Sequence, residues 1–509
     1  MDRFGDPLRS TWLMSKNKWS GAALGLALCT TALASCSVKD NQSGQATSSI
    51  PEIDSAWKSG TERQLRDAIA SAPAHGLKPD LFLKGGEKGG ALTQAALKYA
   101  SALANGYADP TKLHEVYTIP RAKTDVRQGL QQAIQRGDIK GWLDSLAPQT
   151  DEYRALSDAH LHYLQLASRT QFQPVADGKP IKPGSRDPRV VQVTAALRAV
   201  GYLNGPQPTQ PASARQPQAQ RAAASTAYSP DLVAAIKRLQ GEFGFKQDGI
   251  IGGDTLDALN AGPAYRARQL AIAMERLRWL PRNPPATRID VNTAAAVLDY
   301  WRNGQHADHR KVVAGEPDKP TPQLQAPMFQ LVAKPIWTVP KGIGEKELAE
   351  KSPQWLREND FVMKDGLYVQ QSGPKNSLGL VKFDMRDKEA IYLHDTPAKA
   401  LFSMPERHRS HGCVRVESAM QFATALAEQE GVLDDFQGAM QGDEDNKFVR
   451  LPREIPVRLL YQTVFWDGSK VQFRPDVYGW DVNIAKALGL APGAPIRIEQ
   501  PESSDDIGP

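Results

Sequence analysis

The sequence predicts a multidomain α+β protein, with helices in its first half and mostly strands in its second. Between residues 52 and 170 apolar residues recur at spacings of three and four, which is typical of helices with one buried face. From residue 288 onward short alternating runs are bounded by turn residues, which is typical of strands. The length of 509 residues suits about two to four domains of ordinary size.

The first 36 residues have the pattern of a secretory signal. Two lysines precede the apolar run "WSGAALGLALCTTALASC", which is too short to span a bilayer. Its last four residues resemble a bacterial lipobox, so we expect Cys36 to carry lipid, whereas simple cleavage after Ala34 is the alternative. Met14 competes with Met1 as the true start. By resemblance to bacterial lipoproteins, Ser37 favours the outer membrane, and the expected compartment is the periplasm.

Charge, hydropathy and cysteine content limit the classes of partner that we expect for the chain. A net charge of +5, without a basic run that contains aromatic residues, predicts no nucleic-acid binding. No later segment is long and apolar enough to span a bilayer, so the lipid is the only membrane attachment we expect. Cys29 lies in the signal and Cys36 in the lipobox, so Cys413 is the single cysteine of the globular part. A thiol without a partner in an oxidising compartment is a candidate for chemistry.

The helical first half divides into three predicted parts. Residues 37–51 are small and polar and form a tether, and residues 52–186 form a helical scaffold domain. The clearest predicted helices cover residues 62–72, 91–106, 125–135 and 157–168. At the other end of the chain, residues 490–509 are rich in proline and acidic residues and are expected to be disordered.

Residues 187–262 predict a small three-helix unit. Ser229-Pro230 marks the start of the second helix, and Thr255 that of the third. An insertion at 205–228 is rich in Pro, Gln and Ala, and we expect it to be disordered. The run "LQGEFGFKQDGIIGGDT" resembles a peptidoglycan-binding domain of the three-helix type, whereas a generic helical bundle is the alternative. The insertion leaves open how this unit would bind glycan.

Residues 263–489 predict a β-rich domain. Strands are expected within residues 287–301, 310–317, 327–343 and 382–397, and a hairpin within 456–474. The polar, partly helical segment at about 341–370 is expected to form a lid over a site. One clear helix, residues 417–431, follows Cys413.

Histidines and the lone cysteine gather in the run "IYLHDTPAKALFSMPERHRSHGCVRVESAM". His394 is expected to end a strand, and Cys413 to lie at a loop-to-helix junction, where the helix dipole and an imidazole would lower the pKa of the thiol. We therefore interpret Cys413 as a nucleophile and His394 as its base. Gly412 lets the backbone approach a substrate closely, so the amides of His411, Gly412 and Cys413 are candidate oxyanion donors.

Two other interpretations stay open. A zinc site built from His394, His408, His411 and Cys413 is chemically allowed, although the cysteine pairs usual in structural zinc sites are missing. A loop without chemistry is the other. On the nucleophile interpretation neither a metal nor an organic cofactor is needed. His408 is then expected to be an exposed loop residue, and Trp337 and Tyr392 are expected to pack in the core.

The stretch from His394 to Val416 resembles the signature of the YkuD family of L,D-transpeptidases. In that family a histidine is followed after a gap by S-H-G-C, a hydrophobic residue and then Arg or Asn, and here the gap is 413 − 394 = 19. The large YcbB-type subgroup resembles this chain further, in the order of domains and in the runs "VVAGEPDKPTPQ", "KPIWTVPKGI", "SGPKNSLGLVKF" and "FRPDVYGWD".

The resemblance implies a reaction. Cys413 would attack the carbonyl after the third residue of a peptidoglycan stem, release D-alanine and pass the acyl group to a neighbouring stem as a 3→3 cross-link. His394 would act as base and then as acid, oriented by a backbone carbonyl near Asp395. By the same resemblance Ser410, His411 and Gly412 would position the site, and Arg415 would either hold a substrate carboxylate or brace the loop.

The sequence leaves the acceptor open. Water would make the chain an L,D-carboxypeptidase, and a protein amine would attach a protein to the wall. A wall-binding lipoprotein without activity is a further alternative, against which the intact His394 and Cys413 argue. The expected partners are peptidoglycan stem peptides and glycan, and we expect a monomer.

Overall fold

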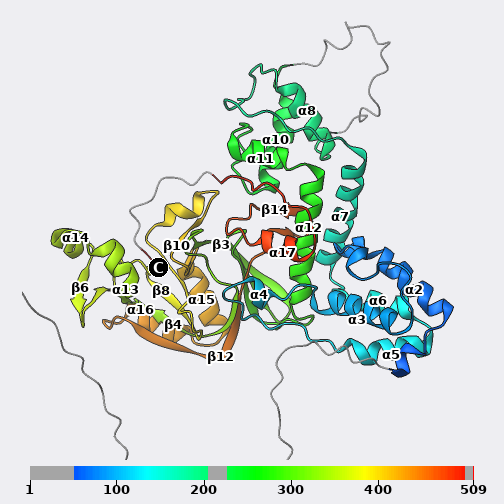
Figure 1. Cartoon of the computed structure of the whole chain (residues 1–509). Helices are drawn as coiled ribbons and strands as arrows, with labels where there is room; N and C mark the ends of the chain where they lie inside the picture. Colours follow the sequence, from blue (N-terminus) through cyan, green and yellow to red (C-terminus); the bar gives the residue numbers. More distant parts are fainter. Residues whose placement is uncertain (1–50, 204–225, 499–507, 509) are drawn as a thin grey trace, which may run out of the picture. The chain divides into compact units, whose positions relative to one another are not determined.

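The computed structural model describes residues 51–203, 226–498 and 508 (Figure 1). The predicted signal, Cys36 and almost all of the tether lie outside these residues, as do most of the 205–228 insertion and residues 499–507. Within the described ranges, none of the helices combines the length and the apolar character that a membrane span requires.

The segment from residue 51 to residue 169 is helical, as predicted. The four helices expected from apolar spacing are confirmed as α2, α3, α5 and α7. Polar caps fix where two of them begin, because Asp125 accepts from the amide of Arg127 and Thr150 accepts from that of Tyr153. The elements are α1 (Pro51–Asp54), α2 (Ser59–Ala70), η1 (Ala72–His75), η2 (Pro79–Leu81), α3 (Gly89–Asn105), α4 (Pro110–Leu113), α5 (Val126–Arg136), α6 (Ile139–Leu146) and α7 (Asp151–Arg169).

The predicted three-helix unit is present as α8 (Val190–Ala199), α10 (Pro230–Glu242) and α11 (Gly253–Asn260). The last residues of the expected insertion were assigned wrongly. Tyr228 is 1% exposed, and its hydroxyl donates to the carbonyl of Gly249 at 2.7 Å. A buried ring with a satisfied hydroxyl belongs to the core of this unit, so the described residues 226–228 are part of the fold.

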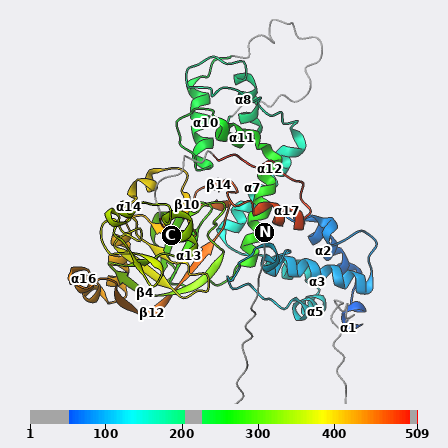
Figure 2. The ribbon, with the colours of Figure 1, turned by 60° about the vertical axis from the view of Figure 1, so that its left-hand side comes forward.

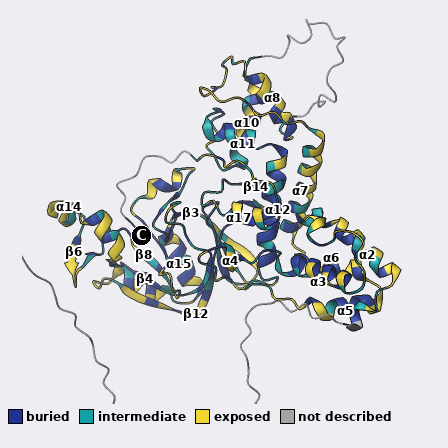
Figure 3. Cartoon of the chain, in the orientation of Figure 1, coloured by how far each residue is buried: buried dark blue, intermediate teal, exposed yellow. Residues whose placement is uncertain are grey.

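Helix α12 (Gly262–Trp279) was not predicted, although its residues were placed in the β-rich domain. Most of its residues are buried (Figure 3), and the buried residues include the charged Arg266, Glu275, Arg276 and Arg278, which hides the usual apolar stripe. The Arg276 guanidinium lies 2.5 Å from Asp481, and Arg278 lies 2.5 Å from Glu275. The buried guanidinium groups of Arg276 and Arg278 therefore each have an opposite charge within hydrogen-bonding distance.

The β-rich domain is built on a nine-stranded sheet with the order β10-β3-β11-β9-β8-β4-β12-β1-β2. Strand β2 also pairs with β3, so the sheet closes on itself. The strands are β1 (Arg288–Asn292), β2 (Val297–Arg302), β3 (Gln305–Gly315), β4 (Leu324–Ala333), β8 (Val381–Met385), β9 (Leu393–His394), β10 (His408–Ser410), β11 (Val414–Val416) and β12 (Lys447–Leu460).

Two helices cover this sheet, α15 (Ala419–Gln429) and α16 (Leu433–Gln441). Helix α16 lies beside β4 and β12 (Figures 1 and 2). Phe422 of α15 and Phe436 of α16 belong to one buried cluster with the sheet residues Phe383 and Val414. The short helix η4 (Lys399–Ser403) packs on β3.

The predicted lid segment forms a small unit of its own. It contains α13 (Lys341–Ile343), the π-helical turn η3 (Gly344–Leu348), α14 (Pro353–Glu358), β6 (Phe361–Lys364) and β7 (Leu367–Gln370). A three-stranded sheet joins β6 and β7 to β5 (Trp337–Thr338). Trp337 is 2% exposed within the cluster under this sheet, which confirms its predicted packing role.

The last described segment continues the fold. The predicted hairpin is confirmed as β13 (Val464–Trp466) and β14 (Val471–Phe473), with Gly468 at φ +94° in the turn, and α17 (Asp481–Ala487) follows. The expectation of disorder from residue 490 is wrong for residues 490–498. Ile496 is 7% exposed, and Arg497 bonds to Asp257 of α11 at 2.7 Å, so packing and an ion pair hold this stretch.

Candidate active site

Cys413 immediately precedes β11, which pairs in parallel with β9. The amide of Val414 donates to the carbonyl of Tyr392 at 3.1 Å, so Cys413 lies opposite Tyr392 and two positions from His394 on the neighbouring strand. Side chains alternate along a strand. Tyr392, His394 and Cys413 therefore face the same side of the sheet.

The surroundings of the thiol differ from the prediction. Helix α15 begins at Ala419, six positions after Cys413, and β11 lies between them. A helix dipole acts only within its first turn, so it does not reach the thiol. Cys413 is 6% exposed, and burial raises the pKa of its thiol to about 11, against hydrogen bonds from Tyr392 that lower it. The expected lowering of this pKa is therefore wrong for this structure, in which the thiol is protonated at neutral pH.

His394 is placed as predicted. It is the last residue of β9, and its Nδ1 lies 2.5 Å from the backbone carbonyl oxygen of Asp395. That oxygen can only accept, so Nδ1 carries the hydrogen, and Nε2 is left with a lone pair. Within the described residues Nε2 is buried and has no hydrogen-bond partner. Burial and the charge of Arg415 hold the pKa of His394 well below its usual value, so the ring is neutral.

The Asp395 carboxylate bonds to a backbone amide and to a lysine, and the imidazole bonds instead to the Asp395 carbonyl, which is the carbonyl-oriented ring that the resemblance implied. One of its oxygens accepts from the amide of Leu380 at 3.0 Å, and the other bonds to Lys399. At Gly379, with φ +63°, a side-chain carbon would lie 2.4 Å from this carboxylate. The turn before β8 therefore needs glycine there, and Asp395 holds that turn beside the site.

The S-H-G-C loop is tied by hydroxyl groups. Ser410 donates from Oγ to the carbonyl of Cys413 at 2.5 Å and accepts from the amide of Gly412 at 3.2 Å. Thr321 donates to the carbonyl of Gly412 at 2.8 Å. Gly412 has φ +115°, which side chains rarely tolerate. Its amide donates to Ser410, and the roles of the His411, Gly412 and Cys413 amides as oxyanion donors stay predictions.

His411 connects this loop to the lid. Its Nε2 bonds to the Glu347 carboxylate of η3, and its Nδ1 lies 2.6 Å from the carbonyl oxygen of Gly508. Glu347 also pairs with Lys319 at 3.3 Å. Glu347 was missed in the sequence, where nothing local distinguishes it from the other acidic residues of the lid.

Arg415 is 1% exposed and is the register partner of His394. Its charge is the second cause, after burial, of the lowered pKa of His394. This position fits the bracing role predicted for it, and a contact with substrate stays a prediction.

His408 does not lie in an exposed loop, contrary to the prediction. It is 7% exposed in β10, where its Nδ1 bonds to Glu406 and its Nε2 lies 2.7 Å from the carbonyl oxygen of Thr293. Both ring nitrogens therefore form hydrogen bonds within the fold. Among the described residues, the side chains of the alternative zinc site do not form a converging ligand group.

Tyr392 was predicted only to pack, but it contacts the reacting groups. Its ring centroid lies 5.7 Å from that of His394, and its hydrogen bonds lower the pKa of the Cys413 thiol. The ammonium of Lys382 lies 4.2 Å from the same ring centroid. Its spacing of two residues from His394 on one strand was the available signal.

Three family profiles match the chain. The "L,D-transpeptidase catalytic domain" of the YkuD family matches residues 286–434, the "Scaffold domain" residues 90–159, and the "Putative peptidoglycan binding domain" residues 186–259. A curated "Putative L,D-transpeptidase" of Haemophilus influenzae is 28% identical over 244 residues. That match covers 43% of this chain and 50% of the relative, so the chain spans about half the length of the curated relative it matches.

Solved structures were compared as well. An L,D-transpeptidase of Stackebrandtia nassauensis is 13% identical with a TM-score of 0.23, covering 57% of this chain and 97% of that one. An L,D-transpeptidase of Mycobacterium smegmatis is 14% identical with a TM-score of 0.20, covering 34% and 58%. Residues 286–434 thus match the L,D-transpeptidase catalytic domain of the YkuD family, preceded by regions that match a scaffold domain and a peptidoglycan-binding domain.

Proposed function

We propose that this protein is an L,D-transpeptidase that forms 3→3 peptidoglycan cross-links through a thioester on Cys413. One observation carries the proposal. The imidazole of His394 is buried and fixed through Nδ1, with Nε2 unbonded within the described residues, on the strand next to the lone cysteine of that part. A base held by a third group beside a nucleophile is the arrangement that covalent acyl transfer requires.

In the first half-reaction Cys413 Sγ forms a bond to the carbonyl carbon after the third stem residue. The thiol proton passes to Nε2 of His394, and the carbonyl oxygen takes up negative charge. When the tetrahedral intermediate collapses, the bond to the D-alanine nitrogen breaks, and His394 returns the proton to that nitrogen. D-alanine leaves, and a thioester remains.

In the second half-reaction the side-chain amine of a neighbouring stem attacks the thioester carbon. The amine proton passes to Nε2 of His394 as the new amide bond forms. The carbon–sulfur bond then breaks, and the proton returns to Cys413. Water in place of the amine would release a shortened stem, which is the carboxypeptidase outcome.

Burial favours a neutral starting pair for this chemistry. The raised pKa of Cys413 and the lowered pKa of His394 both oppose a preformed thiolate–imidazolium pair. The proton therefore moves as the sulfur attacks, so the base is needed in the transition state. The Lys382 charge near the thiol lowers its pKa and would stabilise the sulfur as negative charge develops.

The proposal also covers the cellular location of the protein and its contact with the cell wall. We place the protein in the periplasm, held through lipid on Cys36 and more specifically at the outer membrane. The matched scaffold and peptidoglycan-binding domains support a peptidoglycan substrate with stem peptides and glycan as partners.

Mass spectrometry of muropeptides tests the function. The purified protein is incubated with stem tetrapeptides, and a 3→3 dimer is the expected product. Cys413→Ala should form none, and His162→Gln, which alters an exposed scaffold histidine, should match the parent. A shortened stem without a dimer would indicate a carboxypeptidase, and an unchanged substrate a protein that only binds the wall.

Acylation supplies a second test that needs no acceptor. A carbapenem should add its mass to Cys413 and to no other residue, as measured on the intact protein and its peptides. An unmodified Cys413 in folded protein would contradict the nucleophile assignment.

A further inference from the structure

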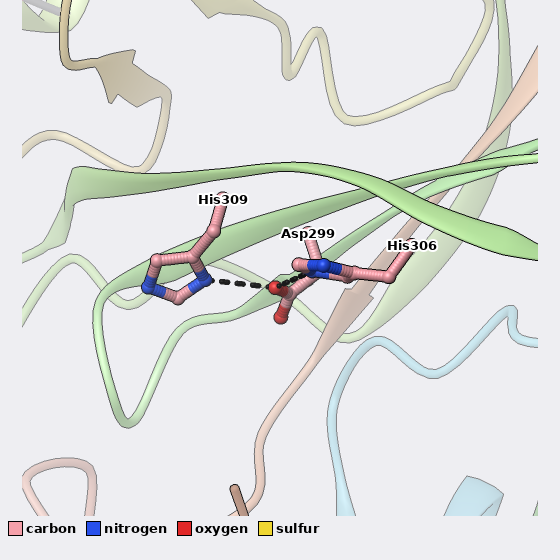
Figure 4. Close-up of side chains that lie close together, drawn as sticks. All are labelled: Asp299, His306 and His309. Carbon is pink, nitrogen blue, oxygen red and sulfur yellow. Dashed lines mark hydrogen bonds and ion pairs between the residues drawn. The ribbon is translucent and has the colours of Figure 1, made fainter. Parts of the chain in front are cut away.

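A second cluster of histidines lies on the β2–β3 hairpin. His306 Nε2 and His309 Nδ1 each lie 2.8 Å from the same oxygen, Oδ1 of Asp299 (Figure 4). The ligand atoms of the three side chains all lie within 4.8 Å of one another, and no other group of this kind occurs in the part of the chain that the structure describes.

A β-bulge creates this cluster. On a regular strand His306 and His309, three residues apart, would face opposite sides. The register shifts between Tyr300 and Trp301, so that β3 carries one extra residue there, and His306 pairs with Trp301 while His309 pairs with Asp299. The shift places both imidazoles on the face of Asp299. Bulges commonly re-aim a side chain in this way.

The three groups are ordinary ligands for a divalent transition metal. Two imidazole nitrogens and one carboxylate form the ligand set of many zinc and iron sites. Two bonds of about 2.1 Å at a tetrahedral angle would separate their donor atoms by about 3.4 Å. The nitrogens now lie 2.8 Å from the carboxylate oxygen, so small side-chain rotations would open the space for an ion.

Access and charge also favour a cation here. The side chains of Asp299, His306 and His309 are 31%, 46% and 56% exposed, so an ion reaches them from solvent. Asp308 and Glu417 add negative charge near His309. The opposing charge is Arg288, which is paired with Asp290 at 2.7 Å and stacked over Trp301.

We propose that Asp299, His306 and His309 bind one divalent transition-metal ion of the zinc class. Three protein ligands leave a fourth position for water. The ion joins β2 to β3, the strand pair that closes the sheet. It therefore acts as a clamp on this hairpin.

The site is separate from Cys413. From His309 to Gly315 the strand runs six residues, which is roughly 20 Å of extended chain. The far end of β3 pairs with β10, the strand that leads into the S-H-G-C loop, through His408↔Ala314 and Ser410↔Gly315. The expected effect of the ion is therefore on the stability of the hairpin and sheet.

Equilibrium dialysis against Zn²⁺ with metal analysis tests the proposal. The full chain is used with Cys413→Ala, which removes the thiol of the globular part as a competing zinc ligand. We expect one bound ion, with affinity reduced at least about tenfold in Asp299→Asn, His306→Gln and His309→Gln, because each removes one of three ligands. The matched control is His162→Gln, which changes an exposed histidine outside the cluster and should leave affinity unchanged.

Thermal unfolding and Co²⁺ absorption complete the test. Zn²⁺ should raise the Tm of the parent, since an ion that binds only the folded state stabilises it, and should not raise that of the three variants. Metal-free circular dichroism establishes that each variant is folded. Co²⁺ should give a tetrahedral visible spectrum that the variants lack. No bound zinc, or equal binding by parent and triad variants, would overturn the metal site and leave a hydrogen-bonded triad.

Discussion

His394 and His309 both bond to an oxygen of an aspartate, yet their surroundings give them opposite properties. His394 is fully buried and donates to the backbone carbonyl of Asp395, and its pKa falls well below the usual value. His309 is 56% exposed and bonds to the carboxylate of Asp299, and its pKa is raised. A neutral carbonyl orients a ring without charging it, whereas a carboxylate favours the charged ring. One sheet therefore holds a histidine whose pKa is lowered and a histidine whose pKa is raised.

The largest expected effect separates the two histidines by function. His394→Ala should slow acylation of Cys413 by about 10²–10⁴, the usual contribution of a positioned base. His309→Ala should leave that rate unchanged, because its ring lies on the hairpin and not beside the thiol. Stopped-flow fluorescence with a carbapenem measures both. Equal slowing in the two variants would mean that damage to the fold, and not loss of a base, explains the result.

A second prediction concerns the protonation of the thiol. With a pKa raised to about 11 by burial, Cys413 is almost entirely a thiol at neutral pH. Its alkylation by iodoacetamide should therefore rise about tenfold per pH unit between about pH 7 and about pH 10, since the thiolate is the reactive form. Quenched reactions read by mass spectrometry give the rates.

The control for this profile is His394→Ala, which should keep the same slope. A rate that is independent of pH near neutrality in the parent, and not in the variant, would reveal a preformed ion pair. The contrast between the buried site, where the pKa of His394 is lowered, and the exposed site, where the pKa of His309 is raised, would then fail.

His411 differs from both in its surroundings, because it is partly buried and bonds to the Glu347 carboxylate of the lid. Glu347→Gln should loosen the lid and raise hydrogen exchange in residues 344–348 a few-fold, because it removes the carboxylate that bonds to both His411 and Lys319. Glu345→Gln is the control, since the ion pair of Glu345 among the described residues is with Lys341 of the same segment, at 3.6 Å. Equal exchange in the two variants would show that Glu347 does not hold the lid.

The smallest expected effect is on the pKa of His309. In metal-free protein Asp299→Asn should lower this pKa, because the hydrogen bond to Asp299 is the main cause that raises it. A group whose pKa is higher in the folded than in the unfolded protein stabilises the fold at pH values below its unfolded pKa. This stabilisation is lost as the pH rises through the folded pKa. Asp299→Asn should therefore cost slightly more stability at low pH than at high pH. NMR titration of the ring protons gives the pKa, and an unchanged value would contradict the role of Asp299.

Local sequence signals predicted much of the architecture. Apolar spacing identified α2, α3, α5 and α7, and alternation identified the strands around the site. The end of β9 at His394 and the contact with the Asp395 carbonyl were also expected and are confirmed. These features depend on neighbours in the chain, so the sequence contains the information. Helix α12 was not predicted, because several of its buried residues are charged. A partner such as Asp481, which pairs with Arg276, comes from far along the chain.

The sequence by itself determined which groups are available: one cysteine in the globular part, a histidine that ends a strand, and a glycine where the loop needs positive φ. Only the tertiary structure decided their state. Burial raises the pKa of the Cys413 thiol, where a lowering was expected. The fold also places His408 in the sheet and brings the Glu347 carboxylate into contact with His411. The bulge on β3 turned two histidines to one face. A pKa and a ligand geometry depend on everything packed around a group, and those atoms come from distant parts of the chain.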